Sequence, residues 1–268
     1  MLLSSVILIL REVLEAALLI SVLLVLTRGL ERSFRWVLWA LLAGMTGAML
    51  YGLGIDTLSG WFDGVGQEVV NALLQVCIFS MIAATMVLLL RQLHGRESGK
   101  LLATAMALTV GLVVTREGAE IMIYLYGFLQ DSAQLGSVLL GAGIGASIGI
   151  SAGVLFYYVL GSCSRRRTVA IGLFVLMLVG AGMASQAAQL LIQADWLPAQ
   201  LPLWDSSGWI SEASVTGQLL YALLGYEATP TAIQAGFYFG GLLILFGVLL
   251  ACLWRCRDGA SVAAEVQG

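Results

Sequence analysis

The sequence predicts an all-α polytopic membrane protein, built as one membrane domain with seven transmembrane helices. Of its 268 residues, 60% are hydrophobic and 11% are charged, and the mean hydropathy is +0.96. Charged residues make up about 25% of a soluble domain, so this composition excludes the ordinary soluble classes. Seven apolar windows are each long enough to cross about 30 Å of hydrocarbon at about 1.5 Å per residue. They are 2–27, 36–55, 69–91, 101–129, 135–161, 168–193 and 231–254.

The charged residues between the windows set the predicted orientation. Eleven of the 13 Lys and Arg lie at alternate ends of the windows: Arg28, Arg32, Arg35, Arg91, Arg96, Lys100, Arg165, Arg166, Arg167, Arg255 and Arg257. The opposite connections carry acidic residues: Asp56, Asp63, Glu68, Asp131, Asp195, Asp205, Glu212 and Glu227. Because Lys and Arg are enriched in cytoplasmic loops, the N-terminus is expected outside and the C-terminus in the cytoplasm. The acidic outer surface would attract cations.

Two windows contain a charged motif near the middle of the membrane. The stretches "LILREVLEAALL" and "VVTREGAEIMIY" share the order Arg-Glu-x-x-Glu, with Arg11, Glu12 and Glu15 in the first and Arg116, Glu117 and Glu120 in the second. On a helix this spacing places all three side chains of a motif on one face. Because each charge at the centre of a membrane helix costs at least about 2.5–3.5 kcal/mol, both motifs are expected to point inward.

The two motifs are 105 positions apart, which indicates an internal repeat. The same offset relates a ladder of small residues, Ala40, Gly44 and Ala48, to Gly145, Gly149 and Gly153. Residues 1–95 and 96–193 each hold three predicted helices, and an odd number inserts the second unit upside down relative to the first. Residues 194–230 form an external connection with an interfacial helix over 214–224, residues 231–254 form the seventh helix, and residues 255–268 form a cytoplasmic tail.

Four carboxylates and two guanidinium groups leave a formal charge of −2, which calls for a cation or protons. Carboxylate oxygens suit a hard metal ion, and permanently charged arginines can hold them in place. Three alternatives use the same residues: an Arg–Glu clasp that only fastens the bundle, a membrane redox enzyme with carboxylate-bound metals, and a structural subunit. Carboxylate di-metal sites normally include a Glu-x-x-His motif, whereas no window contains histidine, so an enzyme is not expected.

Several segments resemble the high-affinity iron permease family. "REVLE" at 11–15 and "REGAE" at 116–120 are similar to its paired Arg-Glu-Gly-Leu-Glu signatures. "GQEVV" at 66–70 resembles the segment that opens the family's third helix, and "LLGYEATPT" at 223–231 resembles the segment before its last helix. The resemblance implies that Glu12, Glu15, Glu117 and Glu120 bind iron during passage and that Arg11 and Arg116 support them. It also implies seven helices in the bacterial inner membrane.

Three positions depart from the family pattern. Val13 replaces a glycine in the first motif and Ala119 replaces a leucine in the second, while all six charges are kept. Asn71 stands where many bacterial members have a second glutamate, three residues after Glu68. A neutral amide there alters affinity, metal preference or proton coupling at an outer site. The iron specificity implied by the resemblance therefore applies more directly to the central site than to the outer site at Glu68 and Asn71.

Other polar residues are candidates for an outer loading site or path: Glu68, Asn71, Gln186, Gln189 and Glu227. Membrane amides also commonly bond neighbouring helices, which is the alternative for the two glutamines. The expected partners are the iron ion as transported substrate, membrane lipid, and an external oxidase or a metal-delivery protein. A permease for another divalent metal is the nearest rival function. No bound organic cofactor and no nucleic acid is expected.

Overall fold

The computed structural model describes residues 2–28, 35–95, 99–128 and 132–265. Within them, seven long helices form: α1 (Leu2–Leu26), α2 (Arg35–Leu53), α4 (Gly66–Leu93), α5 (Gly99–Phe128), α6 (Ser132–Gly161), α7 (Arg165–Gln193) and α9 (Ala232–Glu265). Shorter pieces are α3 (Ile55–Ser59), a 3₁₀ turn at Phe62–Gly64, and α8 (Val215–Leu224). The described chain has no strand, apart from one isolated bridge between Pro202 and Thr231. The all-α prediction is confirmed.

Six described helices are long and apolar enough to cross a membrane: α2, α4, α5, α6, α7 and α9. The chain is therefore a multi-pass membrane protein. Helix α1 has 25 residues but contains the three charges of the first motif, so its crossing, and with it the count of seven, stays a prediction. The predicted windows begin within three residues of the observed helices and end within two, except in α9. Helix α9 continues to Glu265, eleven residues beyond the predicted window.

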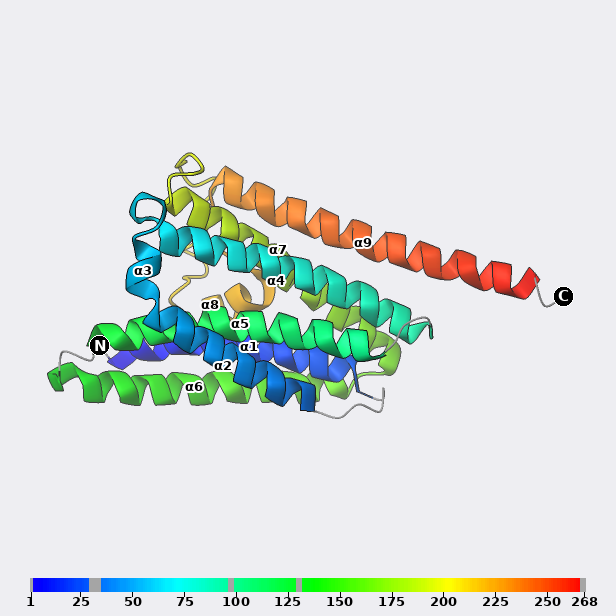
Figure 1. Ribbon diagram of the computed structural model, residues 1–268, viewed down its shortest axis with the longest axis horizontal. Helices are drawn as coiled ribbons and strands as arrows, with labels where there is room; N and C mark the ends of the chain where they lie inside the picture. The colour runs from blue at the N-terminus through cyan, green and yellow to red at the C-terminus, as the bar shows by residue number, and fades with distance from the viewer. Residues whose placement is uncertain (1, 29–34, 96–98, 129–131, 266–268) are drawn as a thin grey trace.

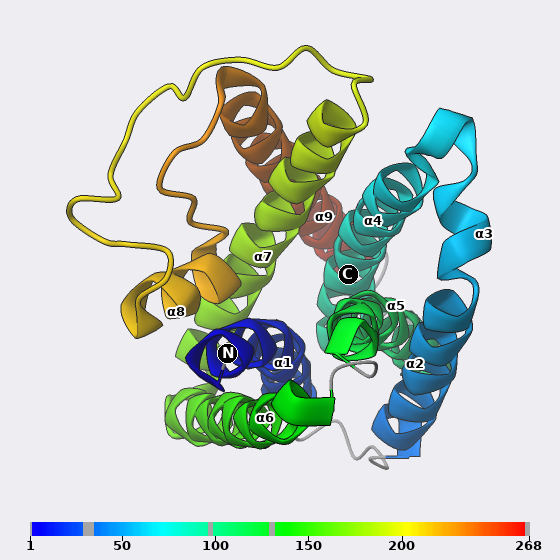
Figure 2. The same cartoon turned by 90° about the vertical axis from the view of Figure 1, so that its left-hand side faces the viewer.

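The long helices alternate in direction and pair across the two halves of the chain. Helix α1 packs along α6, and α2 packs along α5, while α4 packs against α7 (Figure 1). Viewed along the bundle, the α1–α6 pair lies at the lower left and the α2–α5 pair at the lower right (Figure 2). Helix α9 packs against α4 and α7. Helix α1 also contacts α5, so the two charged motifs lie on adjacent helices.

Small residues let the paired helices approach closely. A Cβ on Gly44 of α2 would lie 2.6 Å from the Cβ of Val114 in α5. A Cβ on Gly145 of α6 would lie 2.5 Å from the carbonyl oxygen of Val6 and 3.3 Å from the Cβ of Ile9, both in α1. Real side chains do not occupy such short separations. The ladders of small residues therefore form the contact surfaces by which α2 packs against α5 and α6 packs against α1.

Adding one methyl group to the contact surface between α6 and α1 is expected to destabilise the protein. Gly145→Ala forces α6 away from α1, and overpacking of this kind typically costs about 1–3 kcal/mol. Gly143→Ala is the matched control, because a Cβ at Gly143 of the same helix meets no atom within 4 Å. Thermal unfolding in detergent should show a lower Tm for Gly145→Ala only. Equal Tm values for the two variants would contradict the close packing of this contact surface.

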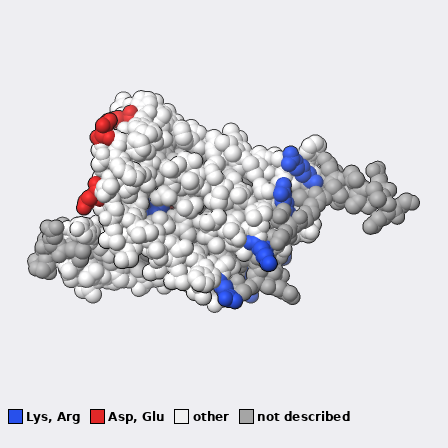
Figure 3. All heavy atoms as spheres, viewed as in Figure 1, with Lys and Arg blue, Asp and Glu red and all other residues white. Residues whose placement is uncertain are grey.

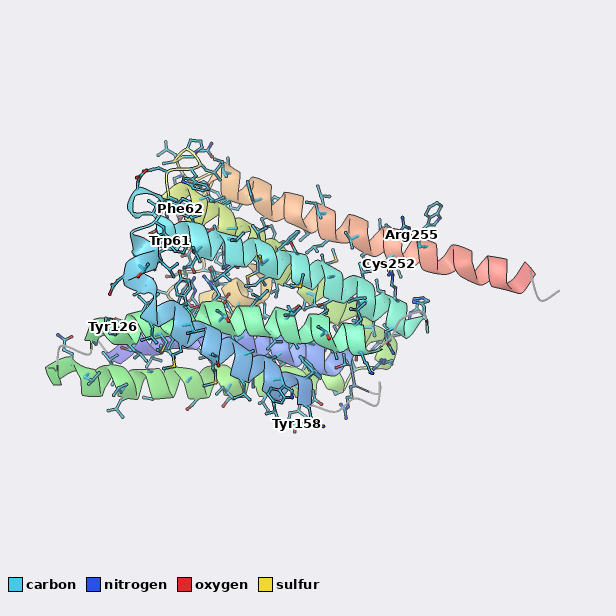
Figure 4. The ribbon with its side chains drawn as sticks, viewed as in Figure 1. Trp61, Phe62, Tyr126, Tyr158, Cys252 and Arg255 are labelled. Carbon is cyan, nitrogen blue, oxygen red and sulfur yellow. The ribbon has the colours of Figure 1, made fainter. Side chains whose placement is uncertain are left out.

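Charged residues divide between the two ends of the bundle. Acidic residues gather at the end that carries α3, and basic residues gather at the opposite end (Figure 3). Trp61, Phe62 and Tyr126 lie toward the acidic end, whereas Tyr158 and Arg255 lie toward the basic end (Figure 4). Four charges used for the predicted orientation lie outside the described residues: Arg32, Arg96, Asp131 and the side chain of Arg257. The assignment of the basic end to the cytoplasm stays a prediction.

Candidate metal site

The two charged motifs meet where α1 packs against α5. Glu12, Glu15, Arg116 and Glu117 are all at most 5% exposed. The sequence expectation that both motifs point inward follows from the cost of charge in hydrocarbon, and the observed burial agrees with it. Such a cluster is stable only if its charges compensate one another or bind an ion.

Arg116 is the central cation of the cluster and lies near all four glutamates. Its Nη1 donates to Glu117 Oε2 at 2.5 Å and lies 3.8 Å from an oxygen of Glu12 and of Glu15. Its Nη2 lies 2.8 Å from Glu120 Oε1. One planar guanidinium group thus links carboxylates from both helices, a geometry that a lysine ammonium group cannot reproduce.

Arg11 occupies a different position although its motif is the same. Its Nε lies 3.7 Å from Glu12 Oε1 and 3.6 Å from Glu15 Oε1, which are longer than hydrogen bonds. Its Nη2 donates to the Tyr221 hydroxyl at 2.7 Å, and the guanidinium carbon lies 4.1 Å from the centroid of that ring. The Arg11 side chain is also 33% exposed. Arg11 is therefore held at the edge of the cluster by α8.

Three of the four motif glutamates converge closely enough to share an ion. Glu12, Glu15 and Glu117 each offer one oxygen, and these oxygens lie within 4.8 Å of one another. A hard cation with oxygen ligands at about 2.1–2.6 Å needs ligand separations of no more than about 4–5 Å. Glu12 Oε2, Glu15 Oε1 and Glu117 Oε1 are buried without a hydrogen-bond partner. The donor set therefore fits a hard metal ion.

Comparison with known proteins agrees with this donor set. Residues 2–257 match the sequence profile of the Iron permease FTR1 family. The chain belongs to the FTR1 iron permease family. That match covers nearly the whole chain, including both motifs, so the expected resemblance is confirmed. With its apolar helices and its bacterial relatives, this FTR1 chain is a multi-pass protein of the bacterial inner membrane.

Curated relatives of this FTR1 chain are named ferrous iron permease EfeU. The protein from Escherichia coli O6:K15:H31 (strain 536) is 28% identical over 282 residues, covering 96% of this chain and 97% of the relative. The one from Shigella sonnei (strain Ss046) is 28% identical over 279 residues, with 95% and 96% covered. The one from Yersinia pestis is 25% identical over 270 residues, with 95% of each covered. No solved structure matches the chain.

Glu120 differs from the other three motif glutamates of the FTR1 chain. Its side chain is 28% exposed and lines a cavity of about 340 Å³. Glu68 and Asn71 of α4 line the same cavity, and Glu68 Oε2 and Asn71 Oδ1 are buried there without a hydrogen-bond partner. Its other polar lining residues are Gln67, Tyr124 and Gln193. The structure thus brings two predicted outer residues beside Glu120, at the edge of the central cluster.

The other predicted outer residues lie elsewhere. Gln186 accepts a hydrogen bond from Gln75 Nε2 at 2.5 Å, which joins α7 to α4, and Gln189 is half-buried on α7. Glu227 lines a separate cavity of about 220 Å³, where Gln234 Nε2 donates to its two oxygens at 2.9 and 3.0 Å. Burial raises the pKa of Glu227, although the bond from Gln234 opposes the shift. The structure does not bring these three to the cavity at Glu120.

Sequence reasoning did not identify Tyr221 as a site residue. Helix α8 forms where a helix was expected, with the Ser214 hydroxyl accepting from the Gly217 N–H at 3.0 Å and Gly225 in the left-handed conformation at its end. The expected helix was an interfacial one, and α8 packs against α1 and α7 and brings Tyr221 to Arg11. The signals available were the helix itself and one tyrosine in it, and neither indicated which arginine it would contact.

Removing the Tyr221 hydroxyl is expected to weaken substrate affinity. Tyr221→Phe keeps the ring under Arg11 but loses a hydrogen bond to a charged group, which is worth about 1.5–3 kcal/mol. Arg11 can then turn toward Glu12 and Glu15 and compete with the ion, so KM for metal uptake should rise about tenfold with little change in maximal rate.

Tyr226→Phe is the matched control for Tyr221→Phe. It removes a hydroxyl from the same connection, where Tyr226 contacts Ser206 and the carbonyl of Ile210 and not the cluster. Uptake measured over a range of metal concentrations checks the prediction. An equal rise in KM for Tyr226→Phe would show that Tyr221 only stabilises the connection.

Proposed function

We propose that the chain is a permease that moves iron ions inward through a carboxylate site between α1 and α5. The observation that carries this proposal is the convergence of three buried glutamates from both motif helices, each of which also has one buried oxygen without a hydrogen-bond partner. Family membership supports iron as the substrate, and the names of the curated relatives favour the ferrous ion. Iron is the cargo of this site and not a resident cofactor, because a transport site must release its ion.

The cavity at Glu120 is the proposed route from outside to the central site. Its carboxylate and amide oxygens, from Glu120, Glu68 and Asn71, are ligand types that hard cations prefer. Glu120 lies at the cavity wall and also contacts Arg116, so an ion there can pass to the buried glutamates as Arg116 changes partners. In a chain oriented as predicted, the membrane potential adds about 2.3 kcal/mol per charge per 100 mV.

Release to the cytoplasm is proposed to follow from movement of the two halves against each other. Helix pairing supports an inverted repeat. In such a repeat α1 corresponds to α5 and α2 corresponds to α6, so the α1–α6 pair is equivalent to the α5–α2 pair. The residues that Gly145 and Gly44 contact, Ile9 and Val114, are 105 positions apart, as the motifs are. By these contacts Gly44 corresponds to Gly145, one helical turn before the Gly149 that the sequence offset assigned.

Iron flux in sealed proteoliposomes tests the proposed function. Purified protein should admit ferrous ion in proportion to protein content, and an inside-negative potential should accelerate it. Assaying ferric ion and other divalent ions in the same vesicles separates iron transport from the rival divalent-metal permease. Vesicles that bind or oxidise iron at the surface without internal accumulation would instead support a redox enzyme or a structural subunit. The same assay with an added oxidase or metal-binding protein tests the expected external partners.

A further inference from the structure

A large apolar groove lies at the basic end of the bundle, and no residue of either motif lines it. It has a volume of about 1020 Å³ and is formed by α4, α7 and α9. Its walls are apolar side chains such as Leu173, Phe246 and Leu253, and its charged or titratable lining residues are Arg166 and His94. None of these residues takes part in the proposed transport route. We propose that this groove binds an anionic phospholipid.

The length of the groove matches one leaflet of a bilayer. Its wall on α9 extends from Leu242 to Leu253, and its wall on α7 extends from Arg166 to Met177. Each distance is eleven residues, or about 16 Å of helix at 1.5 Å per residue. Half of a hydrocarbon core of about 30 Å is about 15 Å. The groove therefore covers the depth over which the acyl chains of one leaflet extend.

The polar end of the groove lies where a lipid headgroup would be. Arg166 is the second residue of α7 and His94 directly follows α4, at the end of the bundle where basic residues gather (Figure 3). Arg255 on α9 lies toward the same end (Figure 4). The guanidinium group of Arg166 can bind two phosphate oxygens at once. This charge favours a headgroup with net negative charge over one that also carries an ammonium group.

The proposed lipid would also hold α9 against the bundle. Helix α9 packs against α4 and α7, and Leu243 and Phe246 on it are 68% and 45% exposed. An acyl chain in the groove would contact all three helices together and cover part of this surface. Because a ligand that binds only the folded state stabilises it, the lipid is expected to raise the Tm of the protein.

Native mass spectrometry and thermal unfolding of the full-length protein test this site. Phosphatidylglycerol, phosphatidylethanolamine and phosphatidylcholine with identical acyl chains are the probes. The wild-type protein should retain phosphatidylglycerol at least about tenfold better than the other two, and its Tm should rise with that lipid alone. Arg166→Gln should remove the preference. Ala170→Trp, which fills the groove without changing charge, should reduce retention of all three lipids.

Arg167→Gln is the matched control, because Arg167 is an exposed neighbour that does not line the groove. It should leave the preference unchanged, and inorganic phosphate should leave the Tm unchanged. Equal retention of the three lipids by the wild-type protein would mean that ordinary boundary lipid fills the groove, and would overturn the proposal. Equal losses in Arg166→Gln and Arg167→Gln would also overturn it, since general surface charge would then explain the preference.

Discussion

Replacing Glu12, Glu15 or Glu117 by Gln is expected to reduce iron uptake by at least about a hundredfold. Each change keeps the side-chain volume but removes the charge of one of three carboxylates whose oxygens lie within 4.8 Å of one another. A neutral amide is a much weaker ligand for a hard cation, and the loss affects every turnover. Initial rates of iron accumulation in proteoliposomes, normalised to inserted protein, give the measurement.

Two comparisons give this prediction its specificity. Glu120→Gln should reduce uptake less, because Glu120 lies at the cavity wall and outside the group of three. Glu227→Gln is the control, since that carboxylate lies in a separate cavity with Gln234. If the motifs only fastened the bundle, each arginine would keep a glutamate after one replacement and transport would survive. A Glu117→Gln variant with normal uptake would therefore contradict the shared site.

Arg116 and Arg11 are expected to differ in their contribution to stability. Arg116→Gln removes the cation that lies near all four glutamates and leaves buried carboxylates without compensation. Removing one partner of a buried ion pair typically destabilises a protein by about 3–5 kcal/mol. Arg11→Gln should cost less, because the Arg11 side chain is a third exposed and lies 3.6 Å or more from its carboxylates. Its main loss is the hydrogen bond to Tyr221, worth about 1.5–3 kcal/mol. The free energy of unfolding in detergent, without metal, is the quantity to measure.

The lysine variants separate charge from geometry. Arg116→Lys keeps the charge but cannot reach Glu117 and Glu120 with two planar nitrogens, so uptake should fall strongly even where stability partly recovers. Arg11→Lys should be tolerated better, since its carboxylate contacts are already long. Similar losses of stability for Arg116→Gln and Arg11→Gln would contradict the unequal roles that the structure indicates.

The long helices and the inward-facing motifs could be predicted because single segments carry the information. A run of about 20 apolar residues predicts a helix long enough to cross a membrane, and the cost of charge in hydrocarbon predicts that the motif side chains face inward. Both motifs have the same Arg-Glu-x-x-Glu order, so the sequence offered no reason to expect different positions for Arg11 and Arg116. Their difference depends on Tyr221, which lies 210 positions from Arg11 in the sequence and reaches it from α8.

Packing partners were the part that single segments could not specify. The ladder around Gly44 indicated a close helix contact but not that its partner would be α5 rather than a sequence neighbour. Because the glycines of α6 recur every four residues, its ladder can be aligned with that of α2 one turn higher or lower. The sequence offset therefore assigned Gly44 to Gly149, whereas the contacts relate it to Gly145. Likewise, Gln186 was expected either on a path or bonded to a neighbouring helix, and Gln75 on α4 is the partner that the structure provides.

The location of bound iron tests the central claim most directly. A crystal structure of the protein with ferrous ion, recorded at the iron absorption edge, identifies iron by its anomalous scattering. We expect one strong peak between α1 and α5, about 2–2.6 Å from carboxylate oxygens of Glu12, Glu15 and Glu117. A peak elsewhere in the protein, with these three carboxylates contacting only Arg116 and one another, would contradict the account.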